Sequence, residues 1–202
     1  MYQAIFKGLL DRFCAAMALL LLAPLMGVIA LTIRISLGRP VLFRQERPGL
    51  GGKPFRLVKF RTMTQETDQE GKLLPDGDRS TFVGRAFRSS SLDELPELWN
   101  ILLGQMSFVG PRPLLMQYLP LYSKEQARRH EVKPGLTGWA QVNGRNSLSW
   151  EEKFHMDVWY VDHVGFSLDL RIVLKTFWKA FRREGIRPDG EATMEYFRGK
   201  NP

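Results

Sequence analysis

Residues 13–33 read FCAAMALLLLAPLMGVIALTI and contain no charged side chain. Arg12 precedes this run and Arg34 follows it. A helix needs about 20 apolar residues to cross the hydrocarbon core of a bilayer, so the run is long enough to do so. A cleaved signal peptide fits poorly, because the run is too long and arginines follow it where a small-residue cleavage site would be needed. The segment therefore predicts a membrane-embedded helix.

Pro24 lies near the middle of this segment, directly after Ala23. A proline inside a helix removes a backbone donor and kinks or breaks the helix. Basic residues flank both ends, with Lys7 and Arg12 before the segment and Arg34 after it, and such residues favour the cytoplasmic side. Both ends satisfy this preference if the helix bends at Ala23-Pro24 and returns to the face it entered. An ordinary kinked transmembrane helix is the alternative, since such helices tolerate proline.

The length and charge of the chain predict one domain with an appendage and an anionic binding partner. The 202 residues are enough for a hydrophobic core, and the formal net charge is +8. That charge favours a nucleotide, a nucleic acid or an acidic membrane surface as partner. The basic residues alternate with acidic ones and no nucleic-acid-binding motif is visible, so nucleic acid is not expected. The single cysteine, Cys14, excludes an intramolecular disulfide.

The segments after the apolar run predict a small mixed domain. Val41–Gln45 and Phe55–Phe60 read as strands of a hairpin, and residues 64–80 read as an exposed loop. Helices are expected at Pro96–Leu103, Leu114–His130 with an interruption near Pro120, Trp150–Tyr160 and Leu168–Arg183. The last of these is amphipathic and basic, so it can lie in a membrane interface or pack on the core.

The predicted fold class is α+β and mainly helical. A re-entrant helix-break-helix is expected over residues 1–36, followed by a cytoplasmic, membrane-associated domain over residues 37–202. This domain should contain a β-hairpin and amphipathic interfacial helices.

The sequence SLDELPEL at residues 91–98 places two adjacent carboxylates, Asp93 and Glu94, in a chain with an excess of basic residues. Arg88 lies just before them and Arg112 follows at some distance. A carboxylate pair near arginines suggests phosphate chemistry, in which one carboxylate attacks and the other holds a divalent cation.

A structural explanation competes with this one. Ser91 and Glu94 have the spacing of a capping box, which places an acidic residue in the first turn of a helix without any catalytic role. If Pro96 is the first helical residue, however, both carboxylates lie outside the helix and are freer to face a ligand.

The segment PGLTGWAQVNGR at residues 134–145 is loop-like, because its three glycines allow a tight backbone. A loop of this kind, ending at Arg145, can cradle a phosphate, although it is not a Walker motif. A plain surface loop is the alternative.

Taken together, these segments resemble the bacterial sugar transferases, specifically the small monotopic polyprenyl-phosphate sugar-1-phosphate transferases. The resemblance covers essentially the whole chain. It includes the apolar helix with its proline, KFRTM at 59–63, RSSSLDELP at 88–96, MSFVGPRP at 106–113 and residues 134–145. Within the family, the chain looks like the compact enzymes of bacterial protein glycosylation that transfer phospho-bacillosamine, and the tail from Arg187 to Pro202 supports this subgroup.

The resemblance implies a two-step transfer. Asp93 matches the family's nucleophile, and Glu94 matches its Mg²⁺ ligand. The expected donor is a UDP-sugar, UDP-N,N′-diacetylbacillosamine in this subgroup, and the acceptor is undecaprenyl phosphate. Asp93 would form a covalent aspartyl-phosphosugar and release UMP, and the acceptor would then take the phosphosugar. Downstream glycosyltransferases are further expected partners.

The resemblance also implies roles for other positions. Arg88 and Arg112 would contact phosphate, Arg145 would contact the nucleotide, and Lys59 would also bind the substrate. Asp157 would support the metal site or order an arginine. The expected location is the cytoplasmic face of the bacterial inner membrane, with a monotopic anchor bent at Pro24. The family usually has a serine where this chain has Ala23, so the resemblance does not fix how sharply the helix bends at Pro24.

A different class of function remains as an alternative. A membrane-anchored module that binds anionic lipid or a nucleotide without catalysis would have the same apolar segment and basic charge.

Overall fold

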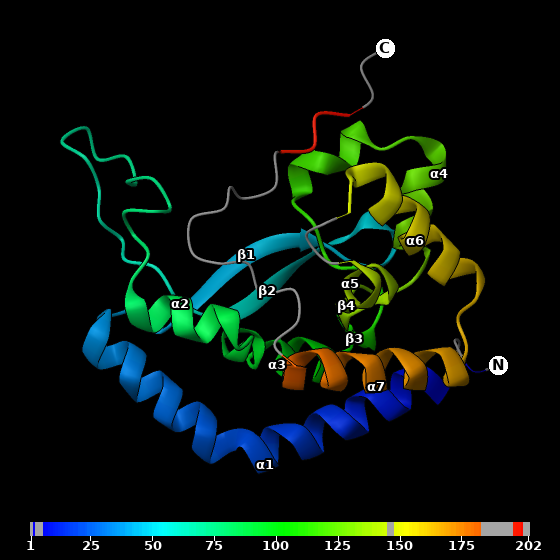
Figure 1. Cartoon of the computed structure of the whole chain (residues 1–202), viewed down its shortest axis with the longest axis horizontal. Coiled ribbons are helices and arrows are strands. Elements are labelled where there is room, and N and C mark those ends of the chain that lie inside the picture. Colours follow the sequence, from blue (N-terminus) through cyan, green and yellow to red (C-terminus); the bar gives the residue numbers. More distant parts are fainter. Residues whose placement is uncertain (1, 3–5, 145–147, 183–195, 200–202) are drawn as a thin grey trace.

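The computed structural model of the chain describes residues 2, 6–144, 148–182 and 196–199. Arg145, which was expected to contact the nucleotide, lies outside the described residues, as does most of the tail from Arg187 to Pro202. The described part contains two small sheets surrounded by helices (Figure 1), so the predicted α+β, mainly helical class is confirmed.

Helix α1 (Lys7–Ser36) lies beneath the rest of the chain, and its axis bends near the middle so that both ends rise toward the domain (Figure 1). Pro24 lies inside this helix, where it removes one backbone hydrogen bond. The helix is continuous, so the expected break between two helices is a bend within one. The helix ends at Ser36.

Both ends of α1 are fixed to the same domain. At the start, Lys7 Nζ lies 2.5 Å from Asp169 Oδ2, and both side chains are buried. At the end, the Arg61 guanidinium donates to the carbonyl oxygen of Leu37, the residue that caps the helix. A cation at this position also interacts favourably with the negative end of the helix dipole. The two arms of α1 therefore return to one body.

One face of α1 packs on the domain and the other is exposed. Ala15 joins a core cluster with Phe55 and Ile101, and Ile29 and Ile33 pack near Phe60. The outward side chains are apolar and exposed, and Leu20, Leu21 and Ile35 are each more than 70% exposed. Among the described helices, α1 alone has the length and hydropathy needed to cross a membrane. An apolar surface this extensive favours contact with lipid over contact with water.

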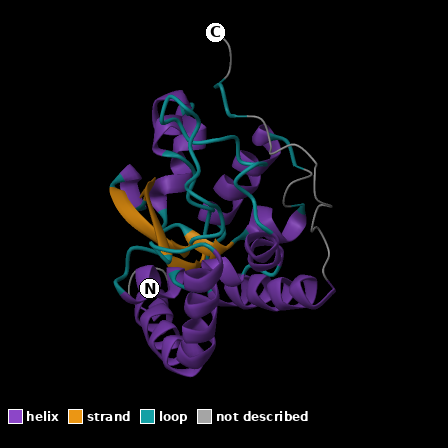
Figure 2. Cartoon of the chain, turned by 90° about the vertical axis from the view of Figure 1, so that its left-hand side faces the viewer, coloured by secondary structure: helices purple, strands orange, loops and turns teal. Residues whose placement is uncertain are grey.

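The predicted hairpin is confirmed. Strands β1 (Leu42–Pro48) and β2 (Pro54–Phe60) pair antiparallel, with Leu42 opposite Phe60 and Pro48 opposite Pro54. A 3₁₀ turn at Leu50–Gly52 connects them. Each strand is longer than the sequence pattern indicated. Figure 2 shows the strands between the long helices of the underside and the helices above.

A second sheet was not predicted. Strands β3 (Ser107–Val109) and β4 (Gly135–Thr137) pair parallel, and α5 (Trp139–Asn143) follows β4 directly. The prediction of a loop over residues 134–145 was therefore wrong for residues 135–137 and 139–143. Each strand has three residues, which is too short for an alternating pattern to be recognised.

Two helical predictions need correction. The expected helix at Leu114–His130 is three short pieces: 3₁₀ turns at Met116–Leu121 and Arg128–Glu131 flank α4 (Lys124–Ala127). Ser123 starts α4 with a capping box to Gln126, so the chain restarts a helix here and does not continue one. In addition, α2 (Phe82–Ser89) occupies a segment for which no helix was predicted.

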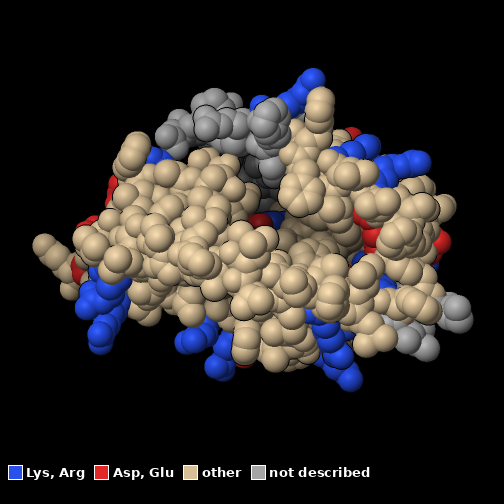
Figure 3. Space-filling model, turned by 90° about the horizontal axis from the view of Figure 1, so that it is seen from below, with Lys and Arg blue, Asp and Glu red and all other residues tan. Residues whose placement is uncertain are grey.

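The remaining helices are close to their predicted positions: α3 (Glu97–Leu102), α6 (Trp150–Asp162) and α7 (Phe166–Arg182). In α7, Ile172 is fully buried, but Leu170, Leu174, Phe177 and Trp178 are exposed. Val173 packs on the core beside Ile172, whereas the four exposed apolar side chains face outward, which favours an interfacial role for that face of α7. Seen from below, the underside of the molecule is largely uncharged and has Lys and Arg at its rim (Figure 3).

Candidate active site

Asp93 and Glu94 lie on a short 3₁₀ turn (Leu92–Glu94) between α2 and α3. Ser91 precedes the turn with a left-handed backbone (φ 57°), and its side chain makes no capping hydrogen bond. The capping-box explanation of Ser91 and Glu94 is therefore wrong. Pro96 directly precedes α3, so both carboxylates lie before that helix, as the alternative interpretation of the sequence expected.

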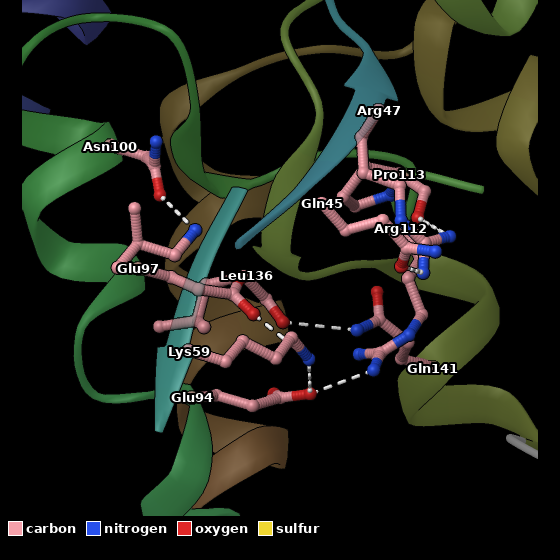
Figure 4. Close-up of polar contacts among 11 residues, drawn as sticks. Gln45, Arg47, Lys59, Glu94, Glu97, Asn100, Arg112, Pro113, Leu136 and Gln141 are labelled. Atoms are coloured by element: carbon pink, nitrogen blue, oxygen red, sulfur yellow. Dashed lines mark hydrogen bonds and ion pairs between the residues drawn. The ribbon is translucent and has the colours of Figure 1, made fainter. Parts of the chain in front are cut away.

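Three separate segments meet at Glu94 (Figure 4). Lys59 of β2 places its Nζ 2.7 Å from Glu94 Oε1 and 3.0 Å from Glu97 Oε1. Arg112 places its Nη2 2.7 Å from the same Glu94 Oε1. The structure thus brings together three of the predicted site residues, Lys59, Glu94 and Arg112, and adds Glu97, which was not predicted.

Asn100 keeps β2 and α3 in register behind this cluster. Its Oδ1 accepts a 3.1 Å hydrogen bond from the Val58 amide, and its Nδ2 donates at 2.8 Å to the Arg56 carbonyl. Asn100 is almost fully buried, so these backbone groups would otherwise lose water without gaining a partner. The two bonds hold Lys59 of the strand opposite Glu97 of the helix (Figure 4).

The neighbouring carboxylates differ in their protonation. Asp93 is buried, and burial together with the negative charge of Glu94 raises its pKa to about 6. Burial would also raise the pKa of Glu94, but the positive charges and hydrogen bonds of Arg112 and Lys59 outweigh it and lower that pKa. Burial raises the pKa of Glu97. Glu94 is therefore the permanently charged member, and Asp93 becomes ionised only toward neutral pH.

Asp157 acts on Arg112 through a second arginine. Its Oδ2 accepts hydrogen bonds from Arg129 Nε at 3.0 Å and from Arg129 Nη2 at 2.7 Å. Arg129 Nη2 also donates at 2.8 Å to the backbone carbonyl of Arg112. Asp157 and Arg129 are both buried. Of the two roles expected for Asp157, the structure shows the ordering of an arginine, and that arginine is Arg129.

Other backbone segments around the cluster are also held by side chains. Arg47 donates at 3.4 Å to the carbonyl of Pro113, the residue after Arg112. Gln141 of α5 donates at 3.0 Å to the carbonyl of Leu136 (Figure 4). These contacts fix two of the segments whose sequences carried the family resemblance.

Arg88 lies on α2, exposed, and donates at 2.7 Å to Ser80 Oγ. It is not one of the residues paired with Glu94, so its contact with phosphate stays a prediction. Sequence reasoning missed Glu97 and Arg129. Glu97 lies within the sequence at residues 91–98, so its acidic side chain was a signal, whereas nothing in the sequence near Arg129 marked it as part of the site.

The oxygen ligands of this cluster suit Mg²⁺. Both ion pairs of Glu94 use Oε1, so neither Lys59 nor Arg112 occupies its Oε2 in these pairs. The described residues contain no group of three or more His, Cys, Asp or Glu that would hold a metal ion unaided. Protein sites for Mg²⁺ commonly use one or two carboxylates and leave the other positions to substrate phosphates and water. Glu94 fits that kind of site.

Comparisons with known proteins identify the family of the chain. A family model described as "Bacterial sugar transferase" matches residues 2–183. The chain belongs to this family. It is 54% identical over 195 residues to the "Uncharacterized sugar transferase EpsL" of Bacillus subtilis, and the match covers 96% of both chains.

Better-described relatives share the same region. The chain is 38% identical over 187 residues to the UDP-glucose:undecaprenyl-phosphate glucose-1-phosphate transferase of Klebsiella pneumoniae. It is also 38% identical over 183 residues to the UDP-N-acetylgalactosamine-undecaprenyl-phosphate N-acetylgalactosaminephosphotransferase of Aeromonas hydrophila. These matches cover 88% and 87% of this chain but only 40% and 43% of the two relatives. The chain thus spans about two fifths of their length.

Proposed function

We propose that this protein transfers a sugar-1-phosphate from a UDP-sugar to undecaprenyl phosphate, with UMP as the second product. The observation that carries the proposal is the pairing of a buried carboxylate, Asp93, with a neighbour, Glu94, that Lys59 and Arg112 hold in its charged form. The names of the relatives from Klebsiella pneumoniae and Aeromonas hydrophila support the class of reaction.

In the first step, an oxygen of ionised Asp93 attacks the β-phosphorus of the UDP-sugar. The bond between this phosphorus and the bridging oxygen breaks, and that oxygen leaves as part of UMP. Asp93 is then joined to the sugar phosphate as an acyl phosphate. In the second step, a phosphate oxygen of undecaprenyl phosphate attacks the same phosphorus and releases Asp93. The carboxylate is regenerated, so the two steps balance without an added acid or oxidant.

The positive charges of Lys59 and Arg112 would allow the carboxylate to approach the diphosphate. A carboxylate and a diphosphate repel each other, so attack requires positive charge near the phosphates. Lys59 and Arg112 lie within hydrogen-bonding distance of Glu94, and we propose that they also bind the donor's phosphate oxygens. Mg²⁺ held at Glu94 would neutralise further charge on the diphosphate. The Arg129–Asp157 pair fixes the backbone of Arg112 and so positions its guanidinium.

The same proposal places the protein on the cytoplasmic face of the bacterial inner membrane, with a re-entrant, monotopic anchor. Both ends of α1 contact one domain, through Lys7–Asp169 and Arg61–Leu37, which supports entry and exit on one side. The apolar underside has a hollow with acidic and basic atoms at its base (Figure 3). An opening on this side would let a lipid-borne phosphate reach charged groups without leaving the membrane.

The identity of the sugar is the least constrained part of the proposal. UDP-N,N′-diacetylbacillosamine is our first candidate, with protein glycosylation as the pathway and downstream glycosyltransferases as partners. The relatives named above act on UDP-glucose and UDP-N-acetylgalactosamine. All three donors therefore belong in the first test.

The deciding experiment measures UMP release by the full chain with each UDP-sugar, with and without undecaprenyl phosphate, followed by organic extraction of labelled sugar. We expect Mg²⁺-dependent label in the organic phase with at least one donor. If no donor releases UMP or yields extractable label, the protein is the membrane-anchored binding module that the sequence left as the alternative.

A further inference from the structure

Two cations without an ion-pair partner among the described residues meet at the first arm of α1. A Cβ placed on Gly8 would lie 3.9 Å from Lys133 Nζ, so this ammonium lies against α1 at the glycine. Arg12 follows Gly8 by four residues, and residues four apart lie on the same face of a helix. Arg12 and Lys133 are therefore neighbours, although they are far apart in the sequence.

This pair is separate from the candidate active site. Arg12 packs on Gly104, where an added Cβ would lie 3.0 Å from its Nε. Gly104 follows the end of α3, whereas Glu97 begins that helix. Six helical residues rise about 9 Å, so the two sites lie at opposite ends of α3.

The charges around Lys133 do not cancel. Lys133 is half-buried, and burial together with the positive charge of Arg12 lowers its pKa. Lys7 also lies near it, but Lys7 is already paired with Asp169. Asp11 contributes one negative charge, and its Oδ1 accepts a hydrogen bond from the Phe108 amide at 3.4 Å. Lys133, Arg12 and Lys7 carry three positive charges, and Asp11 and Asp169 carry two negative ones. The group therefore keeps one positive charge in excess.

The pair also lies where the apolar surface begins. Leu9, Leu10 and Phe13 flank Arg12 on α1, and all three are exposed. Lys and Arg surround the uncharged underside of the molecule (Figure 3). Cations at this boundary lie at the depth of lipid headgroups when the apolar side chains are in the hydrocarbon.

We propose that Arg12 and Lys133 bind the phosphodiester headgroup of an anionic phospholipid, whose acyl chains lie along the exposed side of α1. One excess positive charge matches a singly charged phosphodiester better than the doubly charged phosphomonoester of a lipid acceptor. The Arg12 guanidinium offers a fork of donors to the phosphate oxygens, and Lys133 adds a point charge. The inference rests on the membrane seating in the proposed function, but it does not depend on Asp93 or Glu94.

The test is a native mass spectrometry titration of the full chain in neutral detergent with phosphatidylglycerol, with phosphatidylcholine as the reference lipid. We expect R12Q/K133Q to weaken phosphatidylglycerol binding at least tenfold and to leave phosphatidylcholine binding unchanged. The matched control R34Q/R39Q removes two exposed arginines near the other end of α1 and should keep wild-type binding. R12K/K133R keeps both charges and should retain most of the affinity.

Wild-type affinity in R12Q/K133Q, or an equal loss in R34Q/R39Q, would overturn the site. So would a loss confined to undecaprenyl phosphate, because the pair would then bind the acceptor. Since Arg12 packs on Gly104, K133Q alone is the variant to use if the double variant melts early, and a loss of about threefold is expected for it. UMP release in neutral detergent should stay at the wild-type rate in R12Q/K133Q. A lack of UMP release in every protein would count against the proposed function alone.

Discussion

Arg129 donates a 2.8 Å hydrogen bond to the backbone carbonyl of Arg112, so one buried arginine fixes the position of another that faces the site. Arg129 is itself held by Asp157, and its guanidinium lies over the rings of Tyr122 and Phe154. The two arginines have different roles. Arg129 is almost fully buried and serves as support, whereas Arg112 keeps an exposed side chain for a ligand.

Replacing Asp157 with Ala should therefore destabilise the protein strongly. Removing one partner of a buried ion pair leaves an unpaired buried charge, which costs about 3–5 kcal/mol. Asp157→Asn keeps an oxygen acceptor for Arg129, so it should fold and show a KM for the donor raised about tenfold or more. The control is Asp162→Ala, which breaks an exposed pair with Arg128 and should change the melting temperature little. An Asp157→Ala protein as stable as the control would contradict the supporting role.

Asp93→Asn should abolish turnover while the fold is retained. A missing nucleophile lowers the rate by several orders of magnitude. Labelled phosphosugar should become trapped on the wild-type protein after acid quenching and should be absent from the variant. Rates near wild type for Asp93→Asn would remove Asp93 from the mechanism.

The pH dependence follows from the raised pKa of Asp93. The nucleophile must be ionised, so kcat/KM should fall tenfold per pH unit below about pH 6, the pKa of the free protein. The folded-state pKa is above the ordinary value of 3.8, so ionisation of Asp93 costs stability. Asp93→Asn should therefore be the more stable protein at pH 8, by about 3 kcal/mol at most, and lose this advantage near pH 4. An acid limb near pH 4 would show that Asp93 ionises normally.

Glu94→Gln should weaken the response to Mg²⁺ and lower kcat at least a hundredfold. Gln keeps hydrogen-bond acceptors for Lys59 and Arg112 but loses the charge that a divalent cation needs. Because Ser91 does not cap, no capping energy is lost, and the melting temperature should change little. Glu97→Gln is the matched control, and its Mg²⁺ half-saturation should equal that of the wild type. Equal shifts in the two variants would mean that the metal is not held at Glu94 specifically.

Pro24→Ala should shift some molecules from the re-entrant to a spanning topology, with loss of activity. Without the proline the missing backbone bond can form and the helix straightens. The readout is labelling of a Gln3→Cys probe in a Cys14→Ala background by a membrane-impermeant reagent added outside intact cells. Gly27→Ala changes the same helix without touching the proline and should stay unlabelled, like the wild type. Labelling of the wild-type probe would establish a single-pass protein.

Local patterns predicted the elements that depend on nearby residues. The hairpin and the helices α3, α6 and α7 appear near their expected places, because alternation, helical periodicity and turn glycines are properties of short windows. Helix α2 was missed because Gly84 in its interior disfavours a helix. The reason for that glycine is tertiary: a Cβ there would overlap the carbonyl of Thr62.

The residues of the candidate active site likewise fall into those that local sequence predicted and those that only tertiary contacts reveal. Asp93, Glu94 and Arg112 were found from sequence segments that carry the family resemblance. Glu97 and Arg129 were not found in this way. The role of Glu97 depends on Lys59 of a distant strand, and the role of Arg129 depends on Asp157 of a distant helix. The β3–β4 pairing is non-local for the same reason: residues 107–109 meet residues 135–137 only after the intervening chain has folded back.

The pair between Lys7 and Asp169 joins residues 162 positions apart, so it constrains the order of events during synthesis. At about 5–20 residues per second, synthesis from Ser36, the end of α1, to Asp169 takes roughly 7–27 seconds. The apolar helix therefore meets the membrane while its first arm has no anchor. Seating of that arm must be completed after translation has reached α7, so a chain truncated before α7 would carry the same hydrophobic helix without the contact that holds its first end on the domain.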